Sequence, residues 1–284
     1  MITTKHTIPS RDAFDLGALL LETGRAPIGC VQINSATGVK KEFYLNFATY
    51  LCEVGYHVLL FDYRGIGESR PKSLRGFHAL NHDWGQKDMA AALDWLDERF
   101  PSLPKYAIGH SAGGQQIGFM DNHHKFSKAL AISCSAGYWN YLASPYKYFT
   151  LFVWYVLEPV LNTSIGYLPS SWFNVGEDLP QGVAREWRSW CLSKNYFGDF
   201  LGKTIAKHYF REVKMPVHFL YPEDDSIATE RSVEVLRKFY SSAPTSVERV
   251  LLADYNVKKI GHFGFFSRSS KEKLWPKAID FLKL

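Results

Sequence analysis

The chain has 284 residues, of which 46% are hydrophobic and 21% charged. This balance is that of a globular protein long enough to bury a substantial core, and it excludes disordered and collagen-like chains. The formal net charge is only +5, and lysine or arginine runs go no further than Lys40-Lys41 and Lys258-Lys259. We therefore expect no nucleic-acid partner.

The cysteines and the apolar runs bear on where the protein works. The chain has four widely spaced cysteines, Cys30, Cys52, Cys134 and Cys191. Without a Cys-x-x-Cys spacing they predict buried, reduced thiols rather than a zinc site or a disulfide framework. The first residues lack the apolar core of a signal peptide, and the most apolar run, 148–157, is too short to span a bilayer. We therefore expect a cytoplasmic protein without an integral membrane segment.

From residue 28 onward, strand-like and helix-like segments alternate, which is typical of a parallel α/β sheet. Short, continuously apolar stretches predict strands at 28–35, 57–61, 105–108, 129–133, 217–221 and 248–252. Apolar residues at helical spacing predict helices at 41–53, 83–99, 113–120, near 230–240 and at 271–284. The run 148–157 is predicted to be an amphipathic or buried helix.

Residues 137–210 interrupt this alternation. They show no clear strand pattern, and 19 of the 73 residues from 138 to 210 are aromatic, against 15% in the whole chain. We predict one α/β domain with a core formed by 1–136 and 211–284 and a helical cap inserted at 137–210. The cap's aromatic side chains are expected to fill the cap's own core, to line an apolar acyl or alcohol pocket over the serine at 111, or to do both. The candidates for the pocket are Tyr138, Trp139, Tyr141, Phe149, Phe152, Trp154 and Trp172.

The segment 109–113, GHSAG, fits the pattern Gly-x-Ser-x-Gly. It follows the predicted strand 105–108 and precedes the predicted helix 113–120, which is the context of a nucleophile elbow. Side chains beside the nucleophile would collide in so tight a turn, and the two glycines remove those Cβ atoms. We therefore predict that Ser111 is a nucleophile. The alternative is a glycine-rich turn with an inert serine.

A serine becomes nucleophilic near neutral pH when a base, oriented by a third group, takes its proton. With this kind of elbow the partners follow in the order Ser, Asp or Glu, His. The predicted strand 217–221 runs into Asp224 and Asp225, and we prefer Asp225 because it lies one step further into the loop. His262 is the only histidine after that strand. The spacing therefore predicts that Ser111, Asp225 and His262 form a triad.

Four stretches resemble the α/β-hydrolase superfamily: GHSAGG at the elbow, GYHVLLFDYRGIGES at 55–69, the acid loop YPEDDSIAT and the histidine loop IGHFG. INSATGV, DYRGIGES, DWGQKD and SAGYW are similar to a little-characterised group of predicted bacterial α/β-hydrolases. The resemblance covers essentially the whole chain. It implies an α/β-hydrolase fold, with a mostly parallel central sheet and helices on both faces, and a serine esterase- or lipase-like mechanism.

Acyl transfer also needs N–H donors aimed at the developing oxyanion. One donor is expected at Ala112, directly after the nucleophile. The other should come from the loop after the first core strand, where many members of the superfamily carry His-Gly and this chain has SATG at 35–38. Aligning its first two residues with His-Gly makes the Thr37 backbone the donor, with Ala36 as second choice and a simple turn as the alternative.

These residues predict a carboxylesterase-like serine hydrolase that cleaves a small-molecule ester with an apolar part through an acyl-enzyme. Such a reaction needs no metal and no organic cofactor. A thioesterase, an amidase or peptidase, or an acyltransferase would use the same residues, and the sequence leaves these alternatives open. A non-catalytic protein that binds an apolar small molecule is the alternative from a different class.

Overall fold

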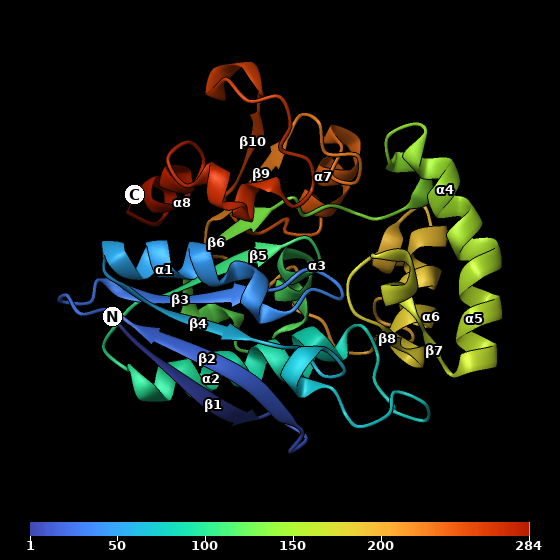
Figure 1. Cartoon of the computed structure of the whole chain (residues 1–284), viewed down its shortest axis with the longest axis horizontal. Helices are drawn as coiled ribbons and strands as arrows, with labels where there is room; N and C mark the ends of the chain where they lie inside the picture. The colour runs from blue at the N-terminus through green and yellow to red at the C-terminus, as the bar shows by residue number, and fades with distance from the viewer. Residues whose placement is uncertain (284) are drawn as a thin grey trace.

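The computed structural model describes residues 1–283 and is built around one eight-stranded sheet (Figure 1). Its strands are β1 (Ile2–Pro9), β2 (Asp15–Glu22), β3 (Gly29–Asn34), β4 (Tyr56–Phe61), β5 (Lys105–His110), β6 (Phe126–Ile132), β9 (Val217–Pro222) and β10 (Thr245–Val250). They are ordered β1-β2-β4-β3-β5-β6-β9-β10, and all neighbours from β4 to β10 are parallel. Every residue of β3 and β4 is buried, as expected for parallel strands covered on both faces.

Helices cover both faces of the sheet, which confirms the predicted fold class. The helices of the chain are α1 (Leu45–Val54), α2 (Ala90–Arg99), α3 (Ala112–Gln115), α4 (Tyr146–Phe152), α5 (Glu158–Ile165), α6 (Gln181–Leu192), α7 (Glu230–Arg237) and α8 (Trp275–Lys283). Apolar residues of α1 and α8 join one buried cluster, and those of α2 and α7 join the other. Figure 1 shows α1 and α8 on the opposite side of the sheet from α2. None of the helices within residues 1–283 combines the length and apolarity needed to cross a membrane.

The sheet begins with an antiparallel hairpin, which is not among the strands predicted from the sequence. β1 pairs with β2 from Ile2 opposite Glu22 to Pro9 opposite Asp15, and β2 pairs antiparallel with β4. β1 is an edge strand with mostly exposed or half-buried side chains, so it lacks the apolar run by which the inner strands are recognised. Its position is fixed by pairing with β2, the next strand along the chain.

Two predicted elements near the C-terminus have different bounds in the structure. The strand predicted at 248–252 is β10, three residues earlier at its start, because parallel pairing with β9 places Thr245 opposite Val217. The helix predicted at 271–284 begins at Trp275, where Pro276 occupies the first turn. Proline is favoured there because its fixed φ suits a helix start and its missing N–H has no helical partner.

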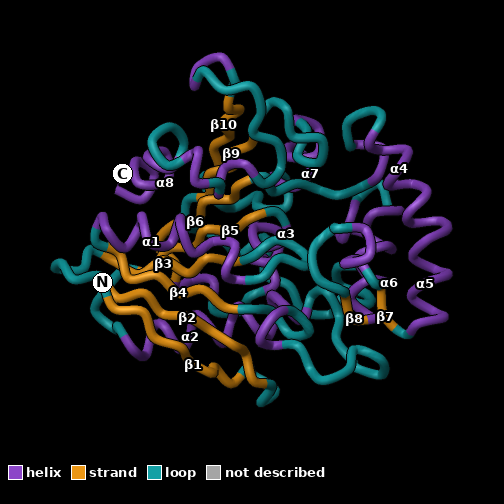
Figure 2. Tube along the Cα trace, viewed as in Figure 1, coloured by secondary structure: helices purple, strands orange, loops and turns teal. Residues whose placement is uncertain are grey.

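Residues 137–210 lie beside the carboxyl ends of the parallel strands (Figures 1 and 2). The segment contains α4, α5 and α6, and the π-helical turn Val153–Leu157 joins α4 and α5 into a continuous helix. It also contains two short antiparallel strands, β7 (Tyr167–Leu168) and β8 (Leu179–Pro180). The sequence shows no strand pattern here, because a pairing of two residues leaves no periodic pattern.

The strand order creates a crevice at one edge of the sheet. β3 lies between β4 and β5. From β3 the chain passes to β4 on one side, and β5 then follows on the other side of β3. Ligands of open α/β sheets bind outside the carboxyl ends of the strands at such a switch point. The loops after β3, β5, β9 and β10 meet at this edge and carry four of the five predicted site residues, Thr37, Ser111, Asp225 and His262, and the fifth, Ala112, directly follows Ser111.

Candidate active site

Ser111 lies on the turn between β5 and α3 and has φ of 51° and ψ of −114°. A non-glycine residue rarely adopts positive φ, and such strain at a strand-to-helix turn is the mark of a nucleophile elbow. The turn requires glycine on both sides of Ser111, because a Cβ atom at either position would clash. A Cβ on Gly109 would lie 2.4 Å from the Gly114 nitrogen, and one on Gly113 would lie 2.1 Å from the Asn34 carbonyl oxygen.

Asp225 and His262 are brought together from the loops after β9 and β10. The His262 Nδ1–H donates to Asp225 Oδ2 at 2.9 Å, with Oδ1 at 3.1 Å. Asp225 Oδ1 also accepts the backbone N–H groups of Ile227 and Ala228, at 2.8 and 2.9 Å. The carboxylate is thereby fixed from two sides, and Nε2 is left as the ring nitrogen that can accept a proton.

The ionisation of Asp225 follows from these contacts. Burial alone would raise the pKa of the Asp225 carboxyl, but the adjacent His262 ring and the two backbone N–H donors outweigh it, and the pKa lies below its ordinary value. Asp225 is therefore a carboxylate at neutral pH. A buried carboxylate hydrogen-bonded to one imidazole nitrogen stabilises a positive charge that forms on that ring.

Asp224 has a different partner, although it is the neighbouring residue. Its Oδ2 accepts the Ile260 N–H at 2.9 Å and its Oδ1 accepts the Gly261 N–H at 2.8 Å. Asp224 therefore holds the backbone immediately before His262 and does not contact the imidazole ring. This role of Asp224 is not visible in the sequence, because it depends on which N–H groups the later loop presents.

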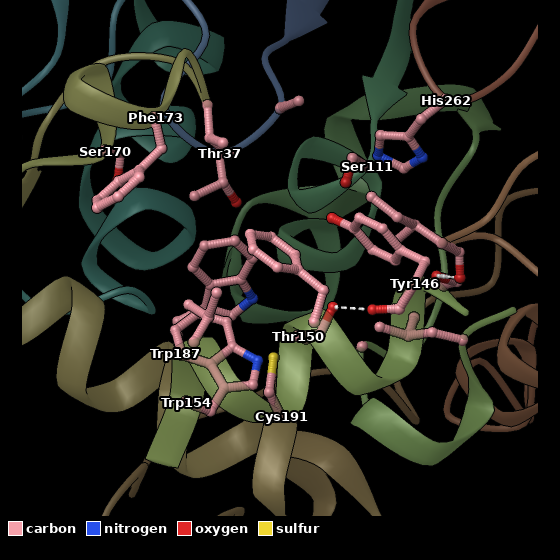
Figure 3. Close-up of a pocket in the computed structure, with 18 of the residues that line it drawn as sticks. Thr37, Ser111, Tyr146, Thr150, Trp154, Ser170, Phe173, Trp187, Cys191 and His262 are labelled. Carbon is pink, nitrogen blue, oxygen red and sulfur yellow. Dashed lines mark hydrogen bonds between the residues drawn. The ribbon is translucent and has the colours of Figure 1, made fainter. Parts of the chain in front are cut away.

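Ser111 and His262 line the same cavity, and Figure 3 shows the serine hydroxyl beside the histidine ring. No hydrogen bond joins the two side chains among residues 1–283. Catalytic hydrogen bonds are often long in a protein without substrate and tighten when substrate binds. Ser111 and His262 are thus close together but are not hydrogen-bonded to each other.

Hydrogen bonding of the backbone N–H distinguishes the two predicted oxyanion donors, Thr37 and Ala112, from the second choice, Ala36. The Ala36 N–H donates to the Tyr44 hydroxyl at 2.9 Å and is therefore occupied. The backbone N–H groups of Thr37 and Ala112 have no acceptor within the described part of the chain. Thr37 also lines the cavity that contains Ser111 (Figure 3).

The cavity has a volume of about 190 Å³ and is mainly apolar. One face of the continuous helix 146–165 provides much of its wall: Tyr146, Phe149, Thr150, Val153, Trp154 and Leu157. Of the seven aromatic candidates, Phe149 and Trp154 line the cavity, and the other five do not. Five further aromatic residues that the sequence did not single out line the cavity: Tyr146, Phe173, Trp187, Tyr196 and Phe263.

The titratable side chains that line this cavity are few. No Asp, Glu, Lys or Arg of residues 1–283 lines it, and His262 is its only titratable side chain apart from the Tyr and Cys groups. Within the same residues, no group of three or more His, Cys, Asp or Glu side chains is placed to hold a metal ion. The four cysteines are buried and unpaired.

A mostly parallel sheet of this order, covered by helices on both faces and carrying a serine on the tight turn after β5, defines an α/β-hydrolase. The sequence pattern of the family described as serine aminopeptidase, S33, matches residues 25–255. The chain belongs to this family and is a serine hydrolase of the α/β-hydrolase type. A comparison with curated protein sequences gives no match.

Solved structures of three esterases share the fold. An esterase from Pyrococcus furiosus is 17% identical with a TM-score of 0.64, and the alignment covers 99% of this chain and 91% of that chain. A thermostable carboxyl esterase from Bacillus coagulans is 14% identical with a TM-score of 0.61, covering 100% and 98%. An esterase from Exiguobacterium antarcticum is 14% identical with a TM-score of 0.63, covering 99% and 100%.

Proposed function

We propose that the protein hydrolyses a carboxylic ester with an apolar part, using Ser111, His262 and Asp225 as a catalytic triad. The observation that carries this proposal is the His262–Asp225 hydrogen bond, which leaves Nε2 free at a cavity shared with Ser111. A nucleophile, a base and a residue that orients the base are the three parts of this mechanism. The strained elbow at Ser111 supports the same assignment.

In the proposed cycle, His262 Nε2 takes the Ser111 proton while the serine oxygen attacks the ester carbonyl. The N–H groups of Thr37 and Ala112 hold the oxyanion, and Asp225 stabilises the imidazolium. The proton on Nε2 then passes to the departing alcohol, leaving an acyl group on Ser111. Water, deprotonated by His262, releases the acid and restores the free serine.

The division into core and cap belongs to the same proposal. Residues 137–210 act as a cap over the site, and residues 1–136 and 211–284 form the catalytic core. In support, the inward face of the helix 146–165 lines the cavity at Ser111, whereas Tyr155 on the same helix is 61% exposed. An apolar substrate group that enters between cap and core is removed from water there, which favours binding.

The lining also favours an ester over an aminopeptidase substrate. An aminopeptidase must bind the charged α-amino group of its substrate, and an isolated ammonium group is costly to bury without a carboxylate partner. The cavity at Ser111 has no Asp or Glu in its lining within residues 1–283. The uncharged acyl or alkyl group of an ester needs no carboxylate partner.

The test compares two chromogenic substrates on three proteins. We expect the wild type to hydrolyse p-nitrophenyl butyrate and to leave leucine p-nitroanilide essentially uncleaved. Ser111→Ala should lose ester hydrolysis by at least about 10⁴-fold. Ser189→Ala is the matched control, because Ser189 lies on α6 and does not line the cavity. Faster cleavage of the anilide, or activity retained in Ser111→Ala, would contradict the proposal.

A further inference from the structure

A buried series of hydrogen bonds connects the loop of Thr37 with the loop of His262. The Ala36 N–H donates to the Tyr44 hydroxyl at 2.9 Å. The Tyr44 hydroxyl lies 2.8 Å from His110 Nδ1, and His110 Nε2 lies 2.9 Å from the carbonyl oxygen of His262. Tyr44 and His110 are both 0% exposed, and neither lines the cavity.

The proton positions in this series follow from one acceptor. The His262 carbonyl only accepts, so His110 Nε2 must carry the hydrogen. In a neutral ring Nδ1 then accepts, and Tyr44 donates its hydroxyl hydrogen to it. The Tyr44 oxygen remains free to accept the Ala36 N–H. Burial, reinforced by the nearby His262 ring, lowers the pKa of His110 to about 3, which keeps the ring neutral at ordinary pH.

The series also has a packed frame. The Phe266 ring lies 4.8 Å from the His110 ring and 4.9 Å from the Tyr44 ring, measured between centroids. His110 directly precedes Ser111 at the end of β5. One imidazole ring therefore lies behind the nucleophile and contacts both the histidine loop and, through Tyr44, the loop that carries Thr37.

We propose that Tyr44 and His110 are positioning residues for the reaction, holding the Thr37 N–H and the His262 ring in register with Ser111. The inference rests on the proposed function, because it presumes that these three groups act together on one substrate. The oxyanion donor and the base belong to separate loops, and the transition state needs both in place at the same moment. A hydrogen-bonded series of fixed polarity limits the relative movement of the two loops.

A role in positioning predicts an effect on turnover rather than on substrate binding. Tyr44→Phe removes one oxygen and keeps the ring that packs on Phe266. It leaves the Ala36 N–H and His110 Nδ1 without partners. We expect kcat on p-nitrophenyl butyrate to fall about tenfold while KM stays within about twofold, because the loss concerns groups that act in the transition state.

Tyr240→Phe is the matched control. Tyr240 is equally buried, and its hydroxyl donates to the Gly114 carbonyl at 2.8 Å without contacting either loop. We expect both substitutions to lower Tm, but only Tyr44→Phe to lower kcat per folded molecule. A purely structural role for Tyr44 would move Tm in both and kcat in neither.

A second pair of variants tests the histidine itself. The amide of His110→Gln can donate to the His262 carbonyl and accept from Tyr44, whereas His110→Leu can do neither. We expect kcat to fall by no more than about fivefold in His110→Gln and by about 100-fold in His110→Leu, while KM stays nearly constant in both variants. This partial rescue by a polar side chain separates hydrogen bonding from simple filling of space.

The outcomes distinguish this inference from the proposed function. A wild-type protein without esterase activity would overturn the proposed function and the inference with it. An active wild type whose Tyr44→Phe, His110→Gln and His110→Leu variants all keep kcat within twofold would overturn the inference alone. Equal losses in His110→Gln and His110→Leu would also overturn it, because the polar contacts would then have no influence on turnover.

Discussion

Asp224 and Asp225 are adjacent in the chain, yet they hold two different parts of the loop that carries His262. Asp225 accepts the Nδ1–H of the ring, and Asp224 accepts the N–H groups of the two residues before it, Ile260 and Gly261. One carboxylate thus orients the side chain, while the other orients the backbone from which that side chain projects.

This division of contacts predicts unequal effects of two isosteric substitutions. In Asp225→Asn, the side chain carries no negative charge, and only one of its two polar atoms can accept a hydrogen bond. The His262 ring therefore loses its preferred tautomer, and we expect kcat to fall by about 10³-fold to 10⁴-fold. In Asp224→Asn, one oxygen still accepts a backbone N–H, and we expect a loss of about tenfold or less. Steady-state kinetics on p-nitrophenyl butyrate measure both, and the opposite ranking would contradict the assignment.

His110 predicts how stability depends on pH. Its pKa is about 3 in the folded protein, because of burial first and of the His262 ring second, against about 6.5 in an unfolded chain. Between these values the unfolded chain binds a proton that the folded protein does not. The stability that His110 contributes is therefore complete above pH 6.5 and declines as the pH falls toward 3, by up to about 1.4 kcal/mol per pH unit.

Urea unfolding between pH 7 and pH 4 measures this slope. His110→Gln has no titrating group at this position, so its free energy of unfolding should fall less steeply than that of the wild type over the same range. Other acidic and basic groups contribute equally to both proteins. Parallel curves for the two proteins would show that His110 titrates in the folded protein much as it does in an unfolded chain.

The apolar cavity predicts a preference among acyl groups. Each methylene buried against the cap contributes roughly 0.8 kcal/mol, which corresponds to up to about a fourfold gain in kcat/KM. We expect kcat/KM to rise from p-nitrophenyl acetate to at least the butyrate before the cavity is full. Kinetics on acetate, butyrate and octanoate esters test this, and a maximum at acetate followed by a steady decline would contradict it.

Two valines on the helix 146–165 offer a matched test of which surface contacts the acyl group. Val153 lines the cavity, whereas Val160 is 57% exposed and does not. Val153→Phe should fill part of the cavity and lower kcat/KM on octanoate relative to acetate by about tenfold, because a packed site accepts added volume poorly. Val160→Phe should leave this ratio unchanged. Equal ratios in the two variants would place the acyl group elsewhere.

The inner part of the fold was predictable because local patterns and tertiary contacts agree there. The apolar run that becomes β4 is buried throughout, so its composition alone indicates a strand covered on both faces. The edge strand β1 gave no such pattern, because most of its side chains are exposed or half-buried and its place depends on β2. The start of β10 likewise depends on its register with β9.

The candidate site was predictable to the extent that chemistry restricts residue types. Glycines flank Ser111 because any larger residue would collide there, and that requirement is visible in the sequence. The lining of the cavity was not predictable in the same way. Trp154 lines the cavity and is 3% exposed, whereas Phe152, two residues earlier, does not line it and is 49% exposed, because the helix presents only one of its faces to the core. A count of aromatic residues does not contain that orientation.

The most direct test of the central claim is covalent labelling with a fluorophosphonate probe, followed by mass spectrometry of the labelled peptides. Such a probe reacts with a serine that an adjacent base has activated. We expect one labelled site, Ser111, in the folded wild-type protein, and no label in Ser111→Ala. A folded wild-type protein that takes up no label, or takes it up at another serine, would contradict the claim that Ser111 is an activated nucleophile.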